Sequence, residues 1–195
     1  MRVGLFSGSF NPVHLGHVAL ADWLVREGEV DEVWFVRTPL NPLKAASGLM
    51  PDADREAMLE LAIAGHKGLR ISRIEDDLPR PNYTVTTLRE LQSRYPDHEF
   101  HLIIGADNWQ VFTSWRDWET ILRQWHVIVY PRPGYSAEGP LPMADYPNVR
   151  LVQAPVSDIS STRIRQTLAE GGDISLMCDP KVADYLIHHV STQDF

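Results

Sequence analysis

Cysteine and long apolar runs are both scarce in this sequence, and each shortage excludes a class of protein. The 195 residues include one cysteine, Cys178, so the chain can form neither an intramolecular disulfide nor a multi-cysteine metal site. No apolar run approaches the roughly 20 residues that a membrane-spanning helix needs. The apolar stretch at residues 1–6 is short and leads directly into a polar glycine loop, unlike a signal peptide. We therefore expect a cytoplasmic protein that is not bound to a membrane.

Positive charge is also in short supply. Lysine and arginine total 18 against 26 aspartate and glutamate residues, which gives a formal net charge of −8. Binding to DNA or RNA depends on neutralising many phosphates, so this balance argues against a nucleic-acid partner. A few local donors can still hold one small phosphorylated ligand in an acidic protein. A phosphate site in this chain should therefore be a localised positive patch.

Two well-known nucleotide-binding loops are absent. The sequence contains neither GxxxxGK followed by Ser or Thr nor GxGxxG, so a phosphate would have to be bound without a P-loop lysine. The sequence also offers no Ser/His/Asp set and no pair of carboxylates suited to acid–base catalysis.

Short β-branched or aromatic runs alternate with helical patterns almost from end to end. The expected strands are 3–6, 32–37, 69–74, 99–104, 126–130 and 149–152. The expected helices are 15–26, about 52–64, about 85–94, 117–122, about 160–170 and 179–189. Repeated strand–helix–strand units predict an α/β fold, with a Rossmann-like parallel sheet and helices on both faces. Ligands bind beyond the carboxyl ends of the strands in such folds.

The length suits one domain. We expect a single domain over residues 1–195, with the C-terminal helices at about 160–190 packed as a small subdomain. No internal repeat or low-complexity segment divides the chain. Residues 131–147, rich in proline, are expected to form a surface excursion rather than a domain boundary.

The loop after the first expected strand has the chemistry of an anion site. Gly8 and Ser9 can expose backbone N–H groups in a tight turn, and the next helix directs its positive end to the same place. His14 and His17 are three residues apart at that helix start, so both rings can face one ligand. Gly16 leaves room for a phosphate near the backbone. A pair of ordinary surface histidines is one alternative, and a metal-binding pair, with no third ligand nearby in sequence, is another.

A second helix start, late in the chain, carries similar donors. Ser160, Ser161 and Thr162 are consecutive hydroxyl residues, and Arg163 and Arg165 follow them. The hydroxyl groups could simply cap the helix by accepting hydrogen bonds from its free N–H groups. Combined with guanidinium groups and free amides, they would also suit a triphosphate.

These two segments together resemble a known superfamily. Residues 8–17 are similar to the signature of the adenylyltransferases with the HxGH motif, which include nicotinate-mononucleotide, phosphopantetheine and cytidylyl transferases. Residues 159–165 are similar to the ISSTxIR motif of the same superfamily. The resemblance implies the HxGH nucleotidyltransferase fold and catalytic roles for His14 and His17. It also implies contacts to ATP and its phosphates from Gly8, Ser9, Phe10, Lys44, Ser161, Thr162 and Arg165.

The lysine in that set stands in a proline-rich loop, residues 38–44, that resembles the family's PxxPPHK-like loop. Leu43 occupies the position where a histidine is common, so a histidine role there is absent. Lys44 keeps the positive charge that could reach a phosphate. A solvated surface lysine is the alternative.

Three middle segments resemble the nicotinate-mononucleotide branch. Residues 81–91 are similar to its SYTxDTL segment, with Asn82 in place of serine and Thr86 in place of aspartate. Asp107 follows an expected strand, where its carboxylate could accept hydrogen bonds from ribose hydroxyls. Trp115 stands at the family's spacing and offers a stacking face for a pyridine ring. Packing is the alternative for this residue, because the chain has six tryptophans.

The resemblance therefore implies a second group of contacts, to the mononucleotide, from Asn11, Thr84, Gly105, Asp107, Trp115 and Arg116. The implied reaction transfers the adenylyl group of ATP to nicotinate mononucleotide and gives deamido-NAD and pyrophosphate. Small nucleotides are the implied partners, with Mg²⁺ accompanying ATP and no separate metal site in the chain. The oligomeric state and the preference between nicotinate and nicotinamide mononucleotide stay open. The alternatives are another member of the superfamily, such as phosphopantetheine adenylyltransferase, and a catalytically silent nucleotide-binding module.

Overall fold

The computed structural model describes residues 1–39 and 48–190, which form one parallel sheet covered by helices. Six strands make up the sheet: β1 (Arg2–Gly8), β2 (Glu32–Arg37), β3 (Leu69–Ser72), β4 (Glu99–Gly105), β5 (His126–Tyr130) and β6 (Val149–Leu151). Their order is β3-β2-β1-β4-β5-β6, and every neighbouring pair is parallel. This is the strand order of a doubly wound Rossmann-type sheet, so the expected fold class is confirmed.

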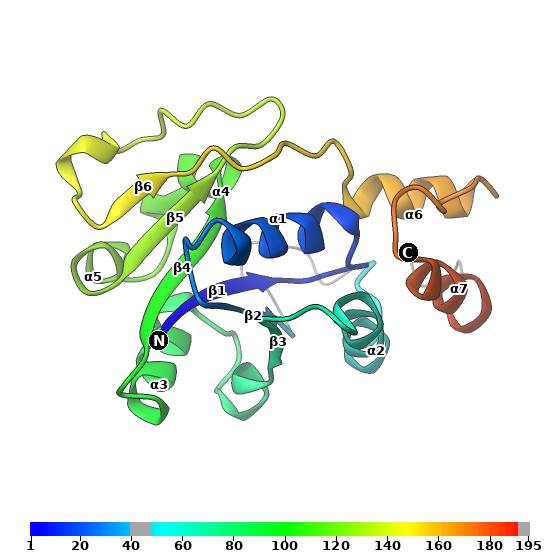
Figure 1. The fold of residues 1–195 in the computed structure, drawn as a ribbon, viewed down its shortest axis with the longest axis horizontal. Coiled ribbons are helices and arrows are strands. Elements are labelled where there is room, and N and C mark those ends of the chain that lie inside the picture. Colours follow the sequence, from blue (N-terminus) through cyan, green and yellow to red (C-terminus); the bar gives the residue numbers. More distant parts are fainter. Residues whose placement is uncertain (40–47, 191–195) are drawn as a thin grey trace.

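Within the described residues, seven α-helices connect the strands or follow them: α1 (Leu15–Arg26), α2 (Asp52–Ile63), α3 (Thr84–Arg94), α4 (Ala106–Gln110), α5 (Trp118–Gln124), α6 (Ser161–Ala169) and α7 (Pro180–His189). Short 3₁₀ turns are η1 (Ile74–Asp77), η2 (Phe112–Ser114) and η3 (Met143–Asp145). Figure 1 shows the strands crossing the middle of the molecule, with α6 and α7 together at one side, beside α2. Whether those last helices form a separate subdomain stays a prediction.

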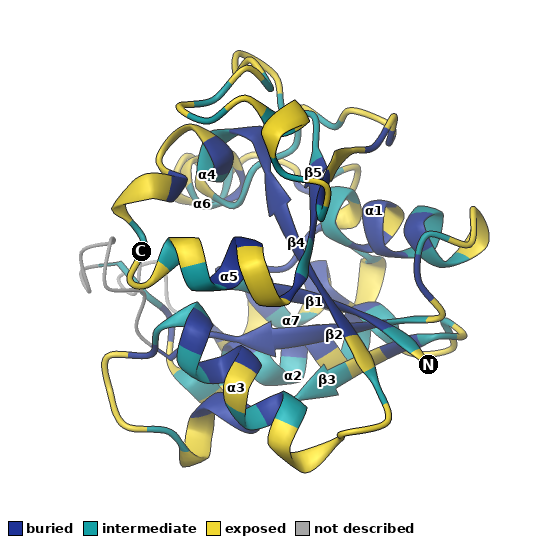
Figure 2. Ribbon diagram, turned by 90° about the vertical axis from the view of Figure 1, so that its left-hand side faces the viewer, coloured by how far each residue is buried: buried dark blue, intermediate teal, exposed yellow. Residues whose placement is uncertain are grey.

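Two hydrophobic cores lie on the two faces of the sheet. One core joins α1, α2, α6 and α7 to inward-facing residues such as Phe35 and Ile128. The other joins α3, α4 and α5 to residues such as Leu5 and Leu102. Figure 2 shows the strands as a buried centre and the helices with exposed outer faces. Alternate residues of each strand point to opposite faces of the sheet, and helices cover both faces. This explains why the strand sequences are continuously apolar.

The elements depart from expectation at the carboxyl ends of two strands. The third strand ends at Ser72, and Ile74 begins the turn η1 instead of extending the strand. Helix α4 was not expected, because its five residues lie inside a segment that reads as a strand end followed by a ligand contact. Both differences fall at the edge where the sheet meets its loops.

The reversal of strand order lies between β1 and β4, since β2 and β3 continue to one side and β5 and β6 to the other. A crevice is expected beyond the carboxyl ends of those two strands. Gly8 ends β1 and Gly105 ends β4, so both expected ligand segments start at this switch point. Among residues 1–39 and 48–190, the helices include no candidate for a membrane-spanning segment.

Candidate active site

The turn after β1 brings the backbone of residues 8–10 to the switch point. Phe10 has a φ of 45°, a left-handed conformation that is uncommon for a bulky residue. Its ring folds back over Gly8, where an added Cβ atom would lie 3.1 Å from the ring. The ring is 3% exposed and makes an edge-to-face contact with His17. The aromatic ring of Phe10 is therefore a core group, and only its backbone is placed to meet a ligand.

The two histidines of the HxGH segment lie against each other at the start of α1. Their rings stack with centroids 3.6 Å apart and planes 27° apart, so they share a face as expected. The backbone N–H of His14 donates to Nδ1 of His17 over 3.3 Å. Because Nδ1 accepts this bond, a neutral His17 ring carries its proton on Nε2, which is then a hydrogen-bond donor.

His14 is held in its neutral form. Burial, followed by the nearby positive charge of Arg132, lowers the pKa of His14 to about 3. Its Nδ1 atom is buried and has no hydrogen-bond partner among the described residues. A buried polar atom without a partner is costly unless a ligand completes it. His14 is therefore suited to a neutral hydrogen bond with an oxygen ligand.

The start of α6 joins the first loop directly. The hydroxyl of Ser161 donates to the carbonyl of Pro12 over 2.8 Å, and Nη1 of Arg165 donates to the carbonyl of Asn11 over 2.7 Å. Ser160 is the N-cap and accepts the backbone N–H of Arg163 over 3.2 Å. Two helix starts that are about 150 residues apart in sequence therefore meet at one place.

The structure gives a further reason for a glycine at position 16, which the sequence did not show. A Cβ atom at this position would lie 2.7 Å from Oγ of Ser157 and 3.1 Å from Nδ1 of His14. The space next to Gly16 is thus occupied by the segment that leads into α6 and by the His14 ring. The glycine lets the two phosphate-motif segments pack together as well as leaving backbone accessible.

The end of β4 supplies a carboxylate and a guanidinium group. Asp107 and Arg132 are joined by a 3.2 Å ion pair from Nη1 to Oδ2, and both side chains lie over Gly105. A Cβ atom at Gly105 would be 2.3 Å from Oδ1 of Asp107, so no larger residue fits there without displacing the pair. The Oδ1 atom of Asp107 is buried without a partner among the described residues. This leaves one acceptor available for a ligand hydroxyl.

A third set of contacts joins the two segments expected to hold the mononucleotide. The guanidinium carbon of Arg116 lies 4.7 Å from the centre of the Tyr83 ring, a cation–π arrangement. Thr84 is the first residue of α3, directly after Tyr83. Trp115 is half-buried and packs against Phe112, and its Nε1 atom has no partner among the described residues.

Comparisons with known proteins identify the family of this chain. The sequence model of the cytidylyltransferase-like family matches residues 5–167. A protein of Bacteroides fragilis named "Probable nicotinate-nucleotide adenylyltransferase" is 46% identical over 194 residues, which cover 99% of this chain and 94% of the relative. A protein of Flavobacterium johnsoniae with the same name is 40% identical and covers 97% of both chains. The chain belongs to the nicotinate-nucleotide adenylyltransferase family.

Solved structures show that the fold is common to this family. A Plasmodium falciparum nicotinic acid mononucleotide adenylyltransferase, complexed with NaAD, superposes with a TM-score of 0.79 at 19% identity and covers 95% of this chain and 94% of its own. A structure titled as a nicotinate-nucleotide adenylyltransferase from Vibrio parahaemolyticus gives a TM-score of 0.72 at 23% identity, with coverage of 95% and 91%. At these identities the likeness concerns the fold alone.

Some residues expected at the site are placed less directly. The side chain of Asn11 is 6% exposed and engaged at both ends, donating to the carbonyl of Gly48 over 2.7 Å and accepting from the backbone N–H of Met50 over 2.9 Å. Its part in binding a mononucleotide stays a prediction. Thr162 is exposed at the start of α6. Lys44 lies outside the described residues.

One site residue was missed from the sequence. Arg132 belongs to the stretch expected to be a surface excursion, yet it lies beside His14 and Asp107 at the switch point. The signal that could have found it is its position, two residues beyond the end of β5, where a parallel sheet delivers side chains to the ligand edge. Arg163, by contrast, is 58% exposed and pairs with Asp158 at 3.6 Å.

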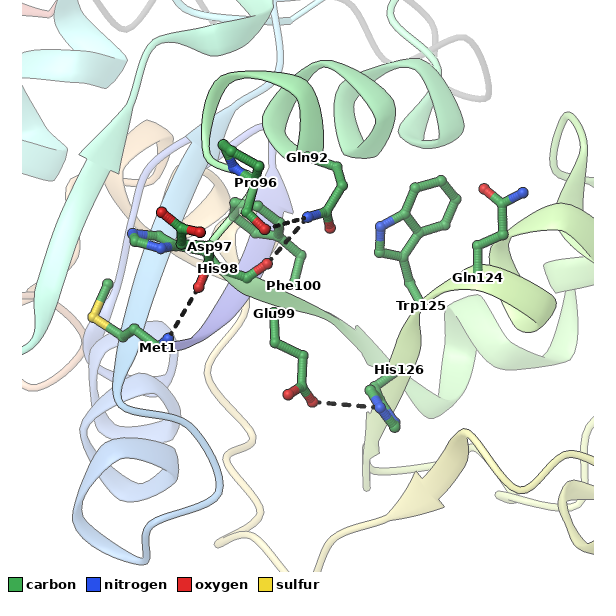
Figure 3. Close-up of a pocket in the computed structure, with 10 residues that line it drawn as sticks. All are labelled: Met1, Gln92, Pro96, Asp97, His98, Glu99, Phe100, Gln124, Trp125 and His126. Atoms are coloured by element: carbon green, nitrogen blue, oxygen red, sulfur yellow. Dashed lines mark hydrogen bonds and ion pairs between the residues drawn. The ribbon is translucent and has the colours of Figure 1, made fainter.

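A hollow of about 390 Å³ lies at the opposite end of the sheet (Figure 3). It is lined by Met1, Gln92, Pro96, Asp97, His98, Glu99, Phe100, Gln124, Trp125 and His126. These residues surround the amino ends of β1, β4 and β5 and include none of the motif residues. The size of this hollow therefore does not make it the substrate site of the family's reaction.

Proposed function

We propose that this chain transfers the adenylyl group of ATP to nicotinate mononucleotide, releasing pyrophosphate and forming deamido-NAD. The observation that carries the proposal is the direct joining of the α1 and α6 starts, through Ser161 to Pro12 and Arg165 to Asn11. Two helix N-termini with hydroxyl, guanidinium and imidazole donors form a site for several phosphate oxygens. The relatives' names supply the pyridine mononucleotide as the second substrate.

The reaction needs no general base. The 5′-phosphate of the mononucleotide is already an anion at neutral pH, and it attacks the α-phosphorus of ATP in line while pyrophosphate departs. Catalysis then consists of positioning the two nucleotides and stabilising charge on the phosphates. His17 donates from Nε2 to the phosphate that becomes pyrophosphate, and neutral His14 adds a second donor.

The remaining residues divide into two groups. For ATP, we propose backbone contacts from Gly8, Ser9 and Phe10 and side-chain contacts from Lys44, Ser161, Thr162, Arg165 and Arg132. For the mononucleotide, we propose that Asp107 accepts ribose hydroxyls, that Trp115 stacks on the pyridine ring, and that backbone groups near Thr84 and Arg116 meet the nicotinate carboxylate. Gly105 gives room for these contacts, and Asn11 holds the first loop in place.

Magnesium fits this site as a companion of ATP. Among residues 1–39 and 48–190, no group of three His, Cys, Asp or Glu side chains is arranged to hold a metal ion. The side chains around the α1 and α6 starts are donors, which bind anions rather than cations. Mg²⁺ would therefore be held by phosphate oxygens and water, where it neutralises phosphate charge. We also propose that the chain acts in the cytoplasm as one domain.

The test is a direct assay of the purified protein with ATP and Mg²⁺. Nicotinate mononucleotide, nicotinamide mononucleotide and 4′-phosphopantetheine are supplied separately, and pyrophosphate and the dinucleotide product are measured. We expect turnover with the pyridine mononucleotides and none with phosphopantetheine. Turnover with phosphopantetheine alone would assign the chain to a different activity, and no turnover with any acceptor would make it a silent binding module.

A further inference from the structure

A cluster of buried polar side chains lies beneath α3 and takes no part in the roles proposed above. Its members are Arg37, Thr38, Glu75, Asn82 and Thr87, each no more than 8% exposed. They come from the carboxyl end of β2, the turn η1, and the start of α3. Buried polar groups require partners, so this cluster calls for an explanation.

The arginine of the cluster is compensated by other carboxylates. Arg37 forms ion pairs with Asp76 at 2.6 Å, Asp52 at 3.0 Å and Glu56 at 3.6 Å. Glu75 forms no ion pair with any residue in the described part of the chain. One of its carboxyl oxygens, Oε2, is buried without a hydrogen-bond partner there. A buried carboxylate without a paired cation is strongly disfavoured.

The Thr87 hydroxyl indicates how the carboxyl group is accommodated. Its oxygen lies 2.7 Å from Oε1 of Glu75 and 3.3 Å from the carbonyl oxygen of Tyr83. A hydroxyl has one proton and can donate to only one of these oxygens. If Glu75 carries a proton and donates it to Thr87, the Thr87 proton is available to the Tyr83 carbonyl and both short contacts are hydrogen bonds.

The pKa of Glu75 is raised on balance, which is the direction that this arrangement requires. Burial raises the pKa of Glu75, while Thr87, Thr38 and the charge of Arg37 act in the opposite direction and Asp76 adds to the rise. Arg37 and Asp76 are thus the charged groups that act on the carboxyl, and they pair with each other.

Tyr83 connects this cluster to the proposed mononucleotide site. Its carbonyl also accepts the backbone N–H groups of Thr86 and Thr87, at 2.8 and 3.1 Å, and so anchors the first turn of α3. Its ring lies under the guanidinium group of Arg116, the residue that follows Trp115 in the sequence. The Asn82 side chain donates to the Glu75 carbonyl over 3.1 Å, which joins the residue before Tyr83 to η1. A shift of Tyr83 would therefore move Thr84, Arg116 and the adjoining tryptophan together.

We infer that Glu75 is a positioning residue that acts as a neutral, protonated acid, donating to Thr87 so that Thr87 can fix Tyr83 and the mononucleotide site around it. The inference rests on the proposed function, because it concerns the site of the second substrate. Glu75 is assigned no direct contact with either nucleotide.

The kinetic test uses matched variants. Glu75→Gln keeps a neutral group that can donate, whereas Glu75→Ala removes it. Thr87→Ser keeps the hydroxyl, whereas Thr87→Val removes it at nearly constant shape. We expect the KM for nicotinate mononucleotide to rise about tenfold in Glu75→Ala and Thr87→Val, with kcat and the KM for ATP nearly unchanged. The Gln and Ser variants should stay within about threefold of the wild type. The Thr87 pair gives this result even if Glu75→Ala fails to fold.

A second readout does not depend on turnover. In the infrared spectrum at pH 7, the wild type should show the carbonyl band of a protonated carboxylic acid, and Glu75→Gln should lack it. Absence of that band from the wild type overturns the inference. So does a Glu75→Gln variant that is as impaired as Glu75→Ala, or a Thr87→Val variant with an unchanged KM for the mononucleotide. Failure of the proposed function would be seen separately, as a wild-type protein that does not make the dinucleotide, and the infrared band would then decide the state of Glu75.

Discussion

Two stacked histidine pairs stand at opposite ends of the same sheet. At the carboxyl end, His14 and His17 lie with ring centroids 3.6 Å apart. At the amino end, His101 and His126 lie with centroids 4.7 Å apart, and His126 lines the hollow of Figure 3. Burial is the largest cause of the lowered pKa of both His14 and His101, and a nearby arginine adds to it in each case, Arg132 for His14 and Arg150 for His101.

The two histidine pairs differ in the charged groups that lie around them. At the amino end, Oε1 of Glu99 lies 2.8 Å from His101 and 3.4 Å from His126, so a carboxylate already supplies negative charge. At the carboxyl end, the described groups are two helix N-termini, a serine hydroxyl and arginines, and the nearby carboxylate of Asp107 is paired with Arg132. Hydrogen-bond donors predominate there, and the phosphates of a nucleotide would supply negative charge. Histidine geometry alone thus does not mark a phosphate site, whereas the charges around it do.

The largest expected effect is on the carboxyl-end pair. His17→Ala should lower kcat by about 10²–10³, because a fixed donor to a charged transition state is lost. The protein should remain folded, since His17 is not part of the main hydrophobic core. Steady-state pyrophosphate release and thermal unfolding measure the two effects. The matched control is His126→Ala, for which we expect unchanged kcat. A folded His17→Ala enzyme with full activity would remove His17 from the mechanism.

The next effect concerns the two arginines. Arg132→Ala should raise the KM for ATP or lower kcat, with a loss of about 10- to 100-fold in kcat/KM, because a charge-assisted contact is removed. Arg150→Ala should leave kcat/KM unchanged, since Arg150 pairs with Glu29 at the other end of the sheet. Equal losses in both variants would mean that the arginines act through general stability rather than through the site.

A smaller effect separates two adjacent serines. Ser161→Ala should lower kcat/KM about tenfold, because the bond that joins α6 to the first loop is lost. Ser160→Ala should leave kcat/KM nearly unchanged and lower the free energy of unfolding by about 1 kcal/mol, because Ser160 caps the helix. Kinetics and urea unfolding of both variants measure the two quantities. The opposite pattern would mean that Ser160, not Ser161, serves the site.

The smallest effect is the pH dependence of stability from His14. Its folded pKa of about 3 lies below the unfolded value of 6.5, so the unfolded chain takes up a proton first as the pH falls. The stabilisation is therefore complete above pH 6.5 and is lost as the pH falls toward 3. Between pH 7 and 6 the loss should be roughly 0.7 kcal/mol. Urea unfolding at both pH values measures it, and His14→Asn should lack this component. A wild type and variant with equal slopes would contradict the buried neutral state of His14.

Much of the fold follows from residue patterns. All six expected strands and the longer helices are present, because runs such as residues 102–104 are apolar on both faces and the helices carry clear start and stop signals. The convergence of the two phosphate motifs was also predicted, because the resemblance to the superfamily implies that both motifs contact ATP. Local sequence patterns were sufficient to predict features that depend on a single helix or strand.

Contacts between distant side chains could not be predicted in the same way. Arg132 lies in a proline-rich stretch that follows β5. Only the order of the strands in the sheet brings it beside His14. The link from Glu75 to Thr87 depends on the position of η1. The sequence instead predicted that Ile74, the first residue of η1, would extend the third strand. The contact of Arg116 with Tyr83 joins two loops that no sequence period relates.

The central claim is that the starts of α1 and α6 bind one triphosphate, and titration with a non-hydrolysable ATP analogue followed by amide NMR tests it directly. We predict that the backbone signals of residues 8–17 and of residues 160–165 shift together, with one dissociation constant, while those of residues 97–101 and 124–126 stay in place. Shifts confined to one of the two helix starts, or two different dissociation constants, would contradict the account.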